Sequence, residues 1–282
     1  MDTSTLTPLL DEIYKSNKTN LEIQHTIRME LEDPIFNYLR STYGKVLKDA
    51  FTSMTIPATS TNTVLLVERR EHPNIEFVLH NFMYFCKGFS LTIVCSDANE
   101  EYIRRILGNH AATTRILPLF KGVGTRQQGI DEYNTLFTTK SFWESIHADY
   151  ILSIQTDCYL RKSLPPILWT VDYVASPWIW KPTMVGGSGL TFRKKECVLD
   201  ICKMPYKNAG GEDVYFSRGC SVLQKKVLSF EEQVDIFSES CISEDPVGVH
   251  QWWTYFIQFY VLQEYDKFSN VCKIYTTLEI TT

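Results

Sequence analysis

The sequence lacks the glycine-rich loops with which many α/β proteins bind phosphate groups. The first buried apolar run, Val64–Val67, leads into the segment VERREHPN at positions 67–74. Neither G-x-G-x-x-G nor G-x-x-x-x-G-K-S/T follows this run. These absences argue against a classical dinucleotide enzyme and against a P-loop NTPase, so a bound diphosphate would have to be held in another way.

The sequence has no paired cysteines, no basic patch and no long apolar run, and each of these absences disfavours a class of protein. The eight cysteines contain no C-x-x-C pair, which argues against a zinc site or a disulfide scaffold and favours buried thiols in a reducing compartment. With a net charge of −5 and no basic patch, we expect no nucleic-acid partner. The chain shows no basic, apolar leader and no run long enough to span a membrane. We therefore expect a soluble, cytoplasmic protein of a microbe or a large virus, of unassigned oligomeric state.

The chain divides by pattern into two parts. Residues 1–60 carry apolar side chains at helical spacing, and we interpret them as an N-terminal helical arm. A stretch rich in Ser, Thr and Pro connects this arm to residues 61–282, which we interpret as one domain.

Buried apolar runs and helical patterns alternate from residue 63 onward. Strands are predicted at 64–67, 90–95, 115–120, 150–154, 171–176 and 190–192. Helices are predicted at 74–86, 99–107, 131–146 and 212–220. This alternation predicts an α/β fold with a Rossmann-type mixed sheet, mostly parallel and flanked by helices.

Polar side chains follow several of the predicted strands, at the sheet edge where ligands bind in such folds. They are Glu68, Arg70, Asp97, Gln155, Thr156 and Asp157. A divalent cation on a carboxylate could replace the missing phosphate loop, because Mg²⁺ and Mn²⁺ favour oxygen ligands. Asp157 is the best candidate for that ligand. The alternative for Asp157 is a turn or helix-capping role.

Three later residues complete the candidate chemistry. His250, in the segment GVHQWW, could be a second metal ligand, although a lone histidine is often structural. Glu212 and Asp213 follow two glycines and open a predicted helix. Either could serve as a general base, and helix capping is the alternative.

A glycine-rich segment and several tryptophans are candidates for sugar contact. Gly187 and Ser188 lie in VGGSGL, where the backbone could approach a sugar closely; a turn or bulge is the alternative. Trp178 and Trp180 could form an apolar platform for a sugar face, with core packing as the alternative. Trp252, two positions after His250, and Glu212 are further candidates for contact with the donor or acceptor sugar.

The motifs together resemble a known family. Their order is VLLVERREHPNIEFVLHNFMYFC, YNTLFTTKSFWE, ILSIQTDCYL, SPWIW, VGGSGLTFRKK, GGEDVYFS and GVHQWW, over roughly residues 63–255. This order resembles a family of uncharacterised glycosyltransferase-like domains, catalogued as a domain of unknown function. That family is similar to the GT-A class of nucleotide-sugar glycosyltransferases.

The resemblance implies roles for particular residues. The GT-A Asp-x-Asp motif would correspond to Gln155-Thr156-Asp157, with Asp157 as a ligand of Mn²⁺ or Mg²⁺. His250 fits a second metal ligand, and Asp213 fits the catalytic base of inverting relatives. The resemblance also implies that Asp97, Glu68 and Arg70 hold the nucleotide. Gln155 departs from the motif, which has an acid at its position.

The predicted function is that of a metal-dependent, inverting glycosyltransferase. It would transfer a sugar from a nucleotide-sugar donor, a UDP-sugar, to a hydroxyl of a glycan or glycoprotein acceptor. One alternative is a sugar nucleotidyltransferase, although such enzymes carry a basic glycine-rich loop that this chain lacks. The other is a non-catalytic carbohydrate- or nucleotide-binding scaffold of the same fold, which Gln155 favours. Retention of configuration stays open, because sequence does not fix the geometry of attack.

Overall fold

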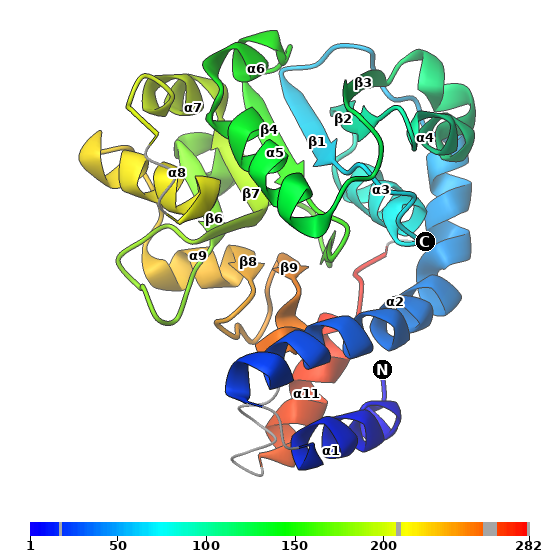
Figure 1. The fold of residues 1–282 in the computed structure, drawn as a ribbon. Helices are drawn as coiled ribbons and strands as arrows, with labels where there is room; N and C mark the ends of the chain where they lie inside the picture. The colour runs from blue at the N-terminus through cyan, green and yellow to red at the C-terminus, as the bar shows by residue number, and fades with distance from the viewer. Residues whose placement is uncertain (17–18, 207–209, 256–263, 281–282) are drawn as a thin grey trace.

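A six-stranded sheet forms the centre of the computed structural model, which describes residues 1–16, 19–206, 210–255 and 264–280 (Figure 1). Its strands follow the order β3-β2-β1-β4-β7-β6. Their bounds are β1 Asn62–Val67, β2 Ser90–Ser96, β3 Arg115–Phe120, β4 Tyr150–Ile154, β6 Tyr173–Ser176 and β7 Gly187–Lys194.

The sheet is mostly parallel. β1, β2, β3 and β4 pair in parallel, whereas β7 runs antiparallel to both β4 and β6. This arrangement confirms the predicted α/β class with a Rossmann-type mixed sheet. The strand order reverses between β1 and β4, and this reversal opens a crevice beyond their carboxyl ends where ligands commonly bind.

Helices cover both faces of the sheet. In β1, Val64 and Leu66 pack on one side and Leu65 on the other, which is the alternation of a strand buried on both faces. One layer consists of α2 Asn20–Ser53, α3 Ile75–Phe85 and α4 Glu100–Leu107, with α1 Thr7–Lys15 and α11 Tyr265–Tyr275 packed beside them. The other consists of α5 Arg126–Thr138, α6 Lys140–Ser145, α7 Lys195–Ile201 and α8 Gly211–Val222. Short 3-10 helices occupy Thr3–Thr5, Gly108–Ala112, Pro166–Thr170 and Trp252–Tyr255.

The predicted helix 131–146 is wrong in its bounds, because two helices occupy that region. α5 begins earlier, at Arg126, where the Thr125 side chain accepts a hydrogen bond from the Gln128 N–H group. It ends at Thr138, because Thr139 is extended, and α6 starts immediately afterwards. The apolar period continues across this break, so the sequence pattern did not reveal it.

A small second sheet lies beside the crevice. It has the order β5-β9-β8, with β5 Cys158–Leu160, β8 Phe237–Ser238 and β9 Gly248–His250; α9 Phe230–Ile236 precedes β8. Cys158 pairs with His250, and Ser238 pairs with Val249. This register brings the residue before β5 and the residue after β8 close to His250.

The N-terminal helical arm is present and packs closely on the rest of the chain. α2 runs below the small sheet and turns upward along one side of the molecule, as expected for a helix with Pro34 inside it (Figure 1). Phe36 of α2 packs edge-on against Phe77, Tyr159 and Trp253. None of the described helices has the length and apolar character needed to cross a membrane.

We expect Phe36→Ala to lower the free energy of unfolding by about 3–5 kcal/mol, because it leaves a cavity where α2, α3, β5 and the Trp252–Tyr255 turn meet. Chemical denaturation would measure the loss. Val46→Ala, at a partly exposed position of the same helix, should cost less than about 1 kcal/mol. Equal, small losses for both variants would show that the arm packs only loosely on the domain.

Candidate functional site

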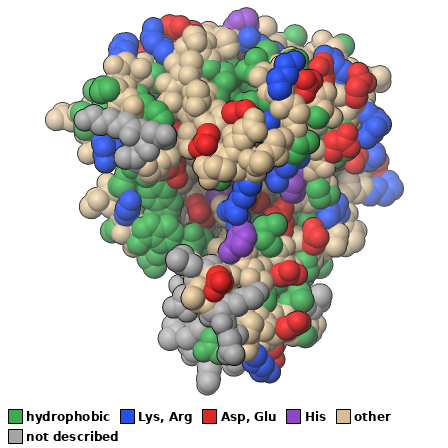
Figure 2. All heavy atoms as spheres, viewed as in Figure 1, with side chains coloured by type: hydrophobic (Ala, Val, Ile, Leu, Met, Phe, Trp, Pro, Cys, Tyr) green, Lys and Arg blue, Asp and Glu red, His purple; other side chains and the backbone are tan. Residues whose placement is uncertain are grey.

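A cleft of about 840 Å³ opens beyond the carboxyl ends of β1 and β4. Its walls come from α2, the first turns of α5 and α8, the start of β7, and the small sheet. Figure 2 shows acidic, basic and histidine side chains gathered in a hollow between the large sheet and the N-terminal helices. The predicted site residues that line the cleft are Glu68, Arg70, Gln155, Thr156, Asp157, Trp178, Gly187, Ser188, Glu212, Asp213 and His250.

The structure does not bring Asp97 and Trp252 to this cleft. The Asp97 carboxylate accepts a hydrogen bond from the Gly122 N–H group at 2.7 Å and pairs with Lys121 at 3.3 Å. Trp252 is fully buried, and its indole N–H donates to the Tyr159 hydroxyl at 2.9 Å. Trp252 therefore belongs to the core, which corrects its proposed contact with a sugar.

Four charged side chains form a line along one wall, and we call Glu239–His250–Asp157–Arg28 the charged row. His250 Nδ1 lies 3.2 Å from Glu239 Oε2, and His250 Nε2 lies 3.2 Å from Asp157 Oδ1. The Arg28 guanidinium donates to Asp157 Oδ2 at 3.0 Å. Negative and positive groups therefore alternate along the row.

The row changes the protonation of its members. Burial alone would lower the pKa of His250, but the carboxylates of Asp157 and Glu239 outweigh burial and raise that pKa to about 9. Burial alone would raise the pKa of Asp157, but His250 and Arg28 hold it well below its usual range. At neutral pH, His250 is therefore protonated and Asp157 ionised.

Two glycines of β7 make room for the row. A Cβ atom at Gly189 would lie 2.1 Å from His250 Nε2, and one at Gly187 would lie 2.9 Å from Glu239 Oε2. A side chain at Gly189 would collide with the His250 ring, and one at Gly187 would force Glu239 to shift. The glycine-rich segment noticed in the sequence therefore gives space to buried charged side chains at the cleft wall.

A second buried acid, Glu212, lines the same cleft. Glu212 accepts a hydrogen bond from the Ser188 hydroxyl, and Glu212 Oε2 lies 3.7 Å from Arg193 Nη2. Arg193 is fully buried, with its guanidinium 4.8–5.4 Å from the ring centres of four aromatic side chains. These rings are Phe137, Trp143, Tyr173 and Phe216. Burial raises the pKa of Glu212 to about 7 despite the opposing effect of Arg193.

Asp213 is the more accessible acid of the pair. It lines the cleft in the first turn of α8, and its Oδ1 accepts a hydrogen bond from the Val214 N–H group at 2.7 Å. Burial raises its pKa, with a smaller contribution from the charge of Glu239. A carboxylate whose pKa is raised is a better proton acceptor than an ordinary surface aspartate.

The end of β1 supplies acidic and basic groups that are already paired. Both carboxylate oxygens of Glu68 accept hydrogen bonds from the Arg70 side chain, at 2.9 and 2.7 Å. Arg69 pairs with Glu132 and donates to the carbonyl oxygens of Lys121 and Gly122. The Arg69 contacts hold the loop between β1 and α3 against the β3–α5 loop and α5, whereas the Glu68–Arg70 pair is internal to the loop after β1.

An aromatic stack stands at the edge of the cleft. Trp178 lines the cleft and lies nearly parallel to Trp180, with ring centres 6.3 Å apart and planes at 13°. Trp180 is 54% exposed and also contacts the Tyr255 ring. The stack thus extends from the cleft to the surface, where it could accept the apolar face of a sugar ring.

Sequence reasoning missed several residues of the site. Arg28 and Glu32 come from the arm, which shows no motif, and Glu239 stands in a short polar segment, Ser238-Glu239-Ser240. Burial and the nearby charge of Asp157 raise the pKa of Glu32 to about 7. A helical face with His25, Arg28, Met29 and Glu32 was the one signal available for the arm residues.

The donor atoms fit a divalent cation that binds together with a phosphate ligand. Asp157 Oδ1 and His250 Nε2 lie side by side, and Glu239 contacts the other ring nitrogen, as a carboxylate often does behind a metal-binding histidine. The described residues contain no group of three His, Cys, Asp or Glu side chains arranged to hold a metal. Two protein ligands suit Mg²⁺ or Mn²⁺, which take their other ligands from water and substrate phosphates.

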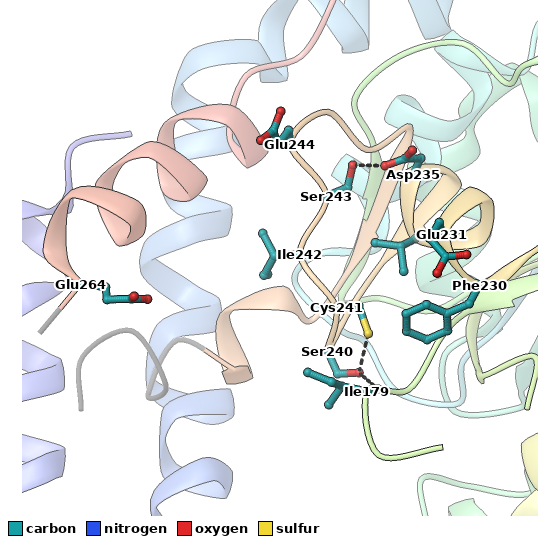
Figure 3. Close-up of a pocket in the computed structure, with 11 residues that line it drawn as sticks. Ile179, Phe230, Glu231, Asp235, Ser240, Cys241, Ile242, Ser243, Glu244 and Glu264 are labelled. Atoms are coloured by element: carbon teal, nitrogen blue, oxygen red, sulfur yellow. Dashed lines mark hydrogen bonds between the residues drawn. The ribbon is translucent and has the colours of Figure 1, made fainter. Parts of the chain in front are cut away.

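A second hollow, of about 550 Å³, lies between α9, residues 240–244 and Glu264 (Figure 3). Its lining is mainly apolar, and the acids Glu231 and Glu244 stand at its edge. The Ser243 hydroxyl donates to Asp235 at 2.6 Å. The residues that line this hollow include no cation, so the cleft is the better candidate site for an anionic ligand.

Comparison with known families agrees with the resemblance found in the sequence. Residues 124–250 match the family described as "Protein of unknown function (DUF5672)". This confirms the predicted likeness to a domain of unknown function. The matched segment contains Asp157, Asp213, Glu239 and His250, whereas Arg28 lies outside it. No curated protein sequence matches the chain.

Two solved structures are similar to this chain, each at 12% sequence identity. One is the mannosyltransferase PcManGT from Pyrobaculum calidifontis, in complex with GDP-Man and Mn²⁺; its TM-score is 0.43, over 73% of this chain and 66% of that one. The other is the apo form of the glycosyltransferase GlyE from Streptococcus pneumoniae, with a TM-score of 0.45, over 75% and 64%. The chain thus spans just under two thirds of the length of each of these structures.

We expect Gly189→Ala to lower the free energy of unfolding by about 1–3 kcal/mol, because the added methyl group collides with the His250 ring. Gly44→Ala should instead raise it by about 0.5–1 kcal/mol, since Gly44 is helical and its Cβ would meet nothing closer than 3.9 Å. Thermal or chemical denaturation would measure both changes.

His250→Ala in the Gly189→Ala background tests the cause of that loss. The double variant should lose less free energy of unfolding than the two single variants lose in total, because the clashing ring is gone. Simple additivity would show that the Gly189 methyl does not meet His250.

Proposed function

We propose that this protein is a glycosyltransferase that moves a sugar from a nucleotide-sugar donor, a UDP-sugar, to a hydroxyl of a glycan or glycoprotein acceptor. One observation carries the proposal. A single cleft at the strand-order reversal holds Asp157 and His250, whose Oδ1 and Nε2 atoms lie side by side, and also Asp213, a carboxylate with a raised pKa. A metal-dependent, inverting transfer of a sugar from a diphosphate would use both a cation site and a general base.

The residues suggest how the reaction would proceed. Asp213 accepts the proton of the acceptor hydroxyl, and the hydroxyl oxygen forms a bond to the anomeric carbon of the donor sugar. The bond between that carbon and the diphosphate oxygen breaks, and the nucleoside diphosphate leaves with the electron pair. A single displacement of this kind inverts the configuration at the anomeric carbon.

Asp157 and His250 would hold the cation, Mn²⁺ or Mg²⁺, which would neutralise charge on the leaving diphosphate. Glu239 fixes the orientation of the His250 ring by contacting its Nδ1 atom. Because His250 carries a proton at neutral pH, a cation must displace that proton from Nε2, and cation affinity should rise with pH.

The walls around these groups suit a sugar substrate. Ser188 and Glu212 present a hydroxyl and a carboxyl group to the cleft beside Asp213. Trp178 also lines the cleft, and its stack with Trp180 continues to the surface. Carbohydrates bind to such combinations of hydrogen-bonding groups and aromatic faces. A carbohydrate acceptor could enter along this stack.

We expect UDP to bind in the presence of Mn²⁺, and Asp157→Asn to weaken this binding at least roughly tenfold, because a carboxylate ligand becomes a neutral amide. Isothermal titration calorimetry with and without Mn²⁺ would measure it, and GDP would be tested in parallel. Asp49→Asn, at an exposed site of α2, is the control. Equal affinity for the Asp157→Asn variant and the wild type would remove Asp157 from the proposed site.

Asp213→Asn should lower kcat for sugar transfer by about 10²–10⁴-fold while leaving UDP affinity unchanged, because the amide cannot accept a proton. Donor and acceptor panels, with mass-spectrometric detection of product, would measure transfer. Asp131→Asn, on the exposed face of α5, is the matched control. Nucleotide binding by the wild type without any transfer would favour the non-catalytic scaffold.

The pH dependence tests the same role. Asp213 acts only when ionised, so kcat should fall as pH drops through its raised pKa, and the acid limb should lie above the range of an ordinary aspartate. An acid limb near the ordinary aspartate pKa would argue against Asp213 as the base.

A further inference from the structure

One face of the arm forms part of the cleft. His25, Arg28, Met29 and Glu32 recur at helical spacing along α2, and all four line the cleft. The Trp253 indole N–H donates to the Arg28 carbonyl oxygen at 3.0 Å, which fixes the backbone of α2 at this turn. The helix therefore holds Arg28 at a defined place beside Asp157.

Arg28 differs from Arg69 and Arg70, the two arginines that line the cleft at the end of β1. Arg69 is buried and bound by Glu132 and two carbonyl groups, and Arg70 is bound by both oxygens of Glu68. The Arg28 side chain is 35% exposed, and within the described part of the chain its guanidinium donates to Asp157. A guanidinium has five N–H donors, so most of its donors can turn toward a ligand in the cleft.

The two carboxylate oxygens of Asp157 face different partners. Its Oδ2 atom is bound by Arg28, whereas its Oδ1 atom faces His250 in the candidate cation pair. Arg28 compensates the charge of this buried carboxylate, which would otherwise be costly to bury. A cation would provide that compensation instead, and it would be repelled by a guanidinium at the same carboxylate.

We propose that Arg28 is an exchangeable counter-ion supplied by the arm: it pairs with Asp157, and it exchanges this partner for the diphosphate of the donor when cation and nucleotide bind. The planar guanidinium suits two phosphate oxygens, and phosphate–guanidinium hydrogen bonds are among the stronger ones in proteins. This inference rests on the proposed function. It makes the arm, outside the matched family segment, a part of the donor site.

If Arg28 exchanges partners in this way, one substitution should change the affinity for Mn²⁺ and the affinity for UDP in opposite directions. In Arg28→Gln, Asp157 loses its competing cation, so affinity for Mn²⁺ alone should rise about fivefold. Affinity for UDP in the presence of saturating Mn²⁺ should fall roughly 10- to 100-fold, because charge-assisted hydrogen bonds to the diphosphate are lost. A merely structural role for Arg28 would not move the two affinities in opposite directions.

The experiment uses the full chain. Free Mn²⁺ is measured by electron paramagnetic resonance, and UDP and GDP binding by calorimetry, for the wild type, Arg28→Gln, Arg28→Lys and Lys45→Gln. Lys45 pairs with Asp49 on the exposed face of α2, so its variant should behave as the wild type does. Arg28→Lys keeps the charge and should recover part of the UDP affinity without the rise in Mn²⁺ affinity. Circular dichroism and thermal unfolding confirm that each variant folds.

The results of this experiment distinguish failure of the proposed function from failure of the proposed Arg28 exchange. If the wild type binds neither UDP nor GDP with Mn²⁺, the proposed function fails and the role of Arg28 fails with it. If the wild type binds a nucleotide, then unchanged UDP and GDP affinity in Arg28→Gln, or Mn²⁺ affinity that does not rise, overturns the exchange alone. Weaker nucleotide binding together with tighter Mn²⁺ binding supports it.

Discussion

Burying a charged side chain is unfavourable unless an opposite charge lies next to it. The charged row Glu239–His250–Asp157–Arg28 meets this requirement, because each side chain in the row lies beside one of opposite charge. Each member contacts the next at 3.0 or 3.2 Å. The four residues come from separate segments: the residue after β8, the end of β9, the turn before β5, and α2. Removing one member would leave its neighbour buried with less compensation. The arm, the small sheet and the cleft wall are therefore coupled through this row.

The remaining features of the cleft follow from fitting these charges into a packed interior. Gly187 and Gly189 leave the space that Glu239 and His250 occupy, because a Cβ atom at either glycine would collide with those side chains. The buried acid Glu212 is compensated differently, by Arg193, whose guanidinium is surrounded by aromatic faces. The cleft thus carries a row of alternating charges suited to a cation and an anion. It also carries acids of raised pKa, Glu212 and Asp213, suited to accepting a proton.

The fold was largely predictable, and the site was predictable in part. β3 and β4 have the predicted bounds, because continuous apolar runs between polar segments define buried strands. The strand-end rule found Glu68, Gln155 and Asp157, since the carboxyl ends of β1 and β4 meet at the strand-order reversal. The same rule failed for Asp97, which lies at the correct edge of the sheet but is held by Gly122 and Lys121. Spacing could not reveal that local contact.

The sequence by itself determined the alternation of strands and helices, the helical arm and the identity of most candidate groups. Those features depend on hydrophobic patterns and turn residues close together in the chain. Only the tertiary structure decided that Arg28 meets Asp157 across 129 positions, that Glu239 supports His250, and that Trp252 is a core residue. These outcomes depend on the register of the small sheet and on the path of α2 past the cleft. Both are set by long-range packing, because many segments must bury their apolar faces and compensate their charges at the same time.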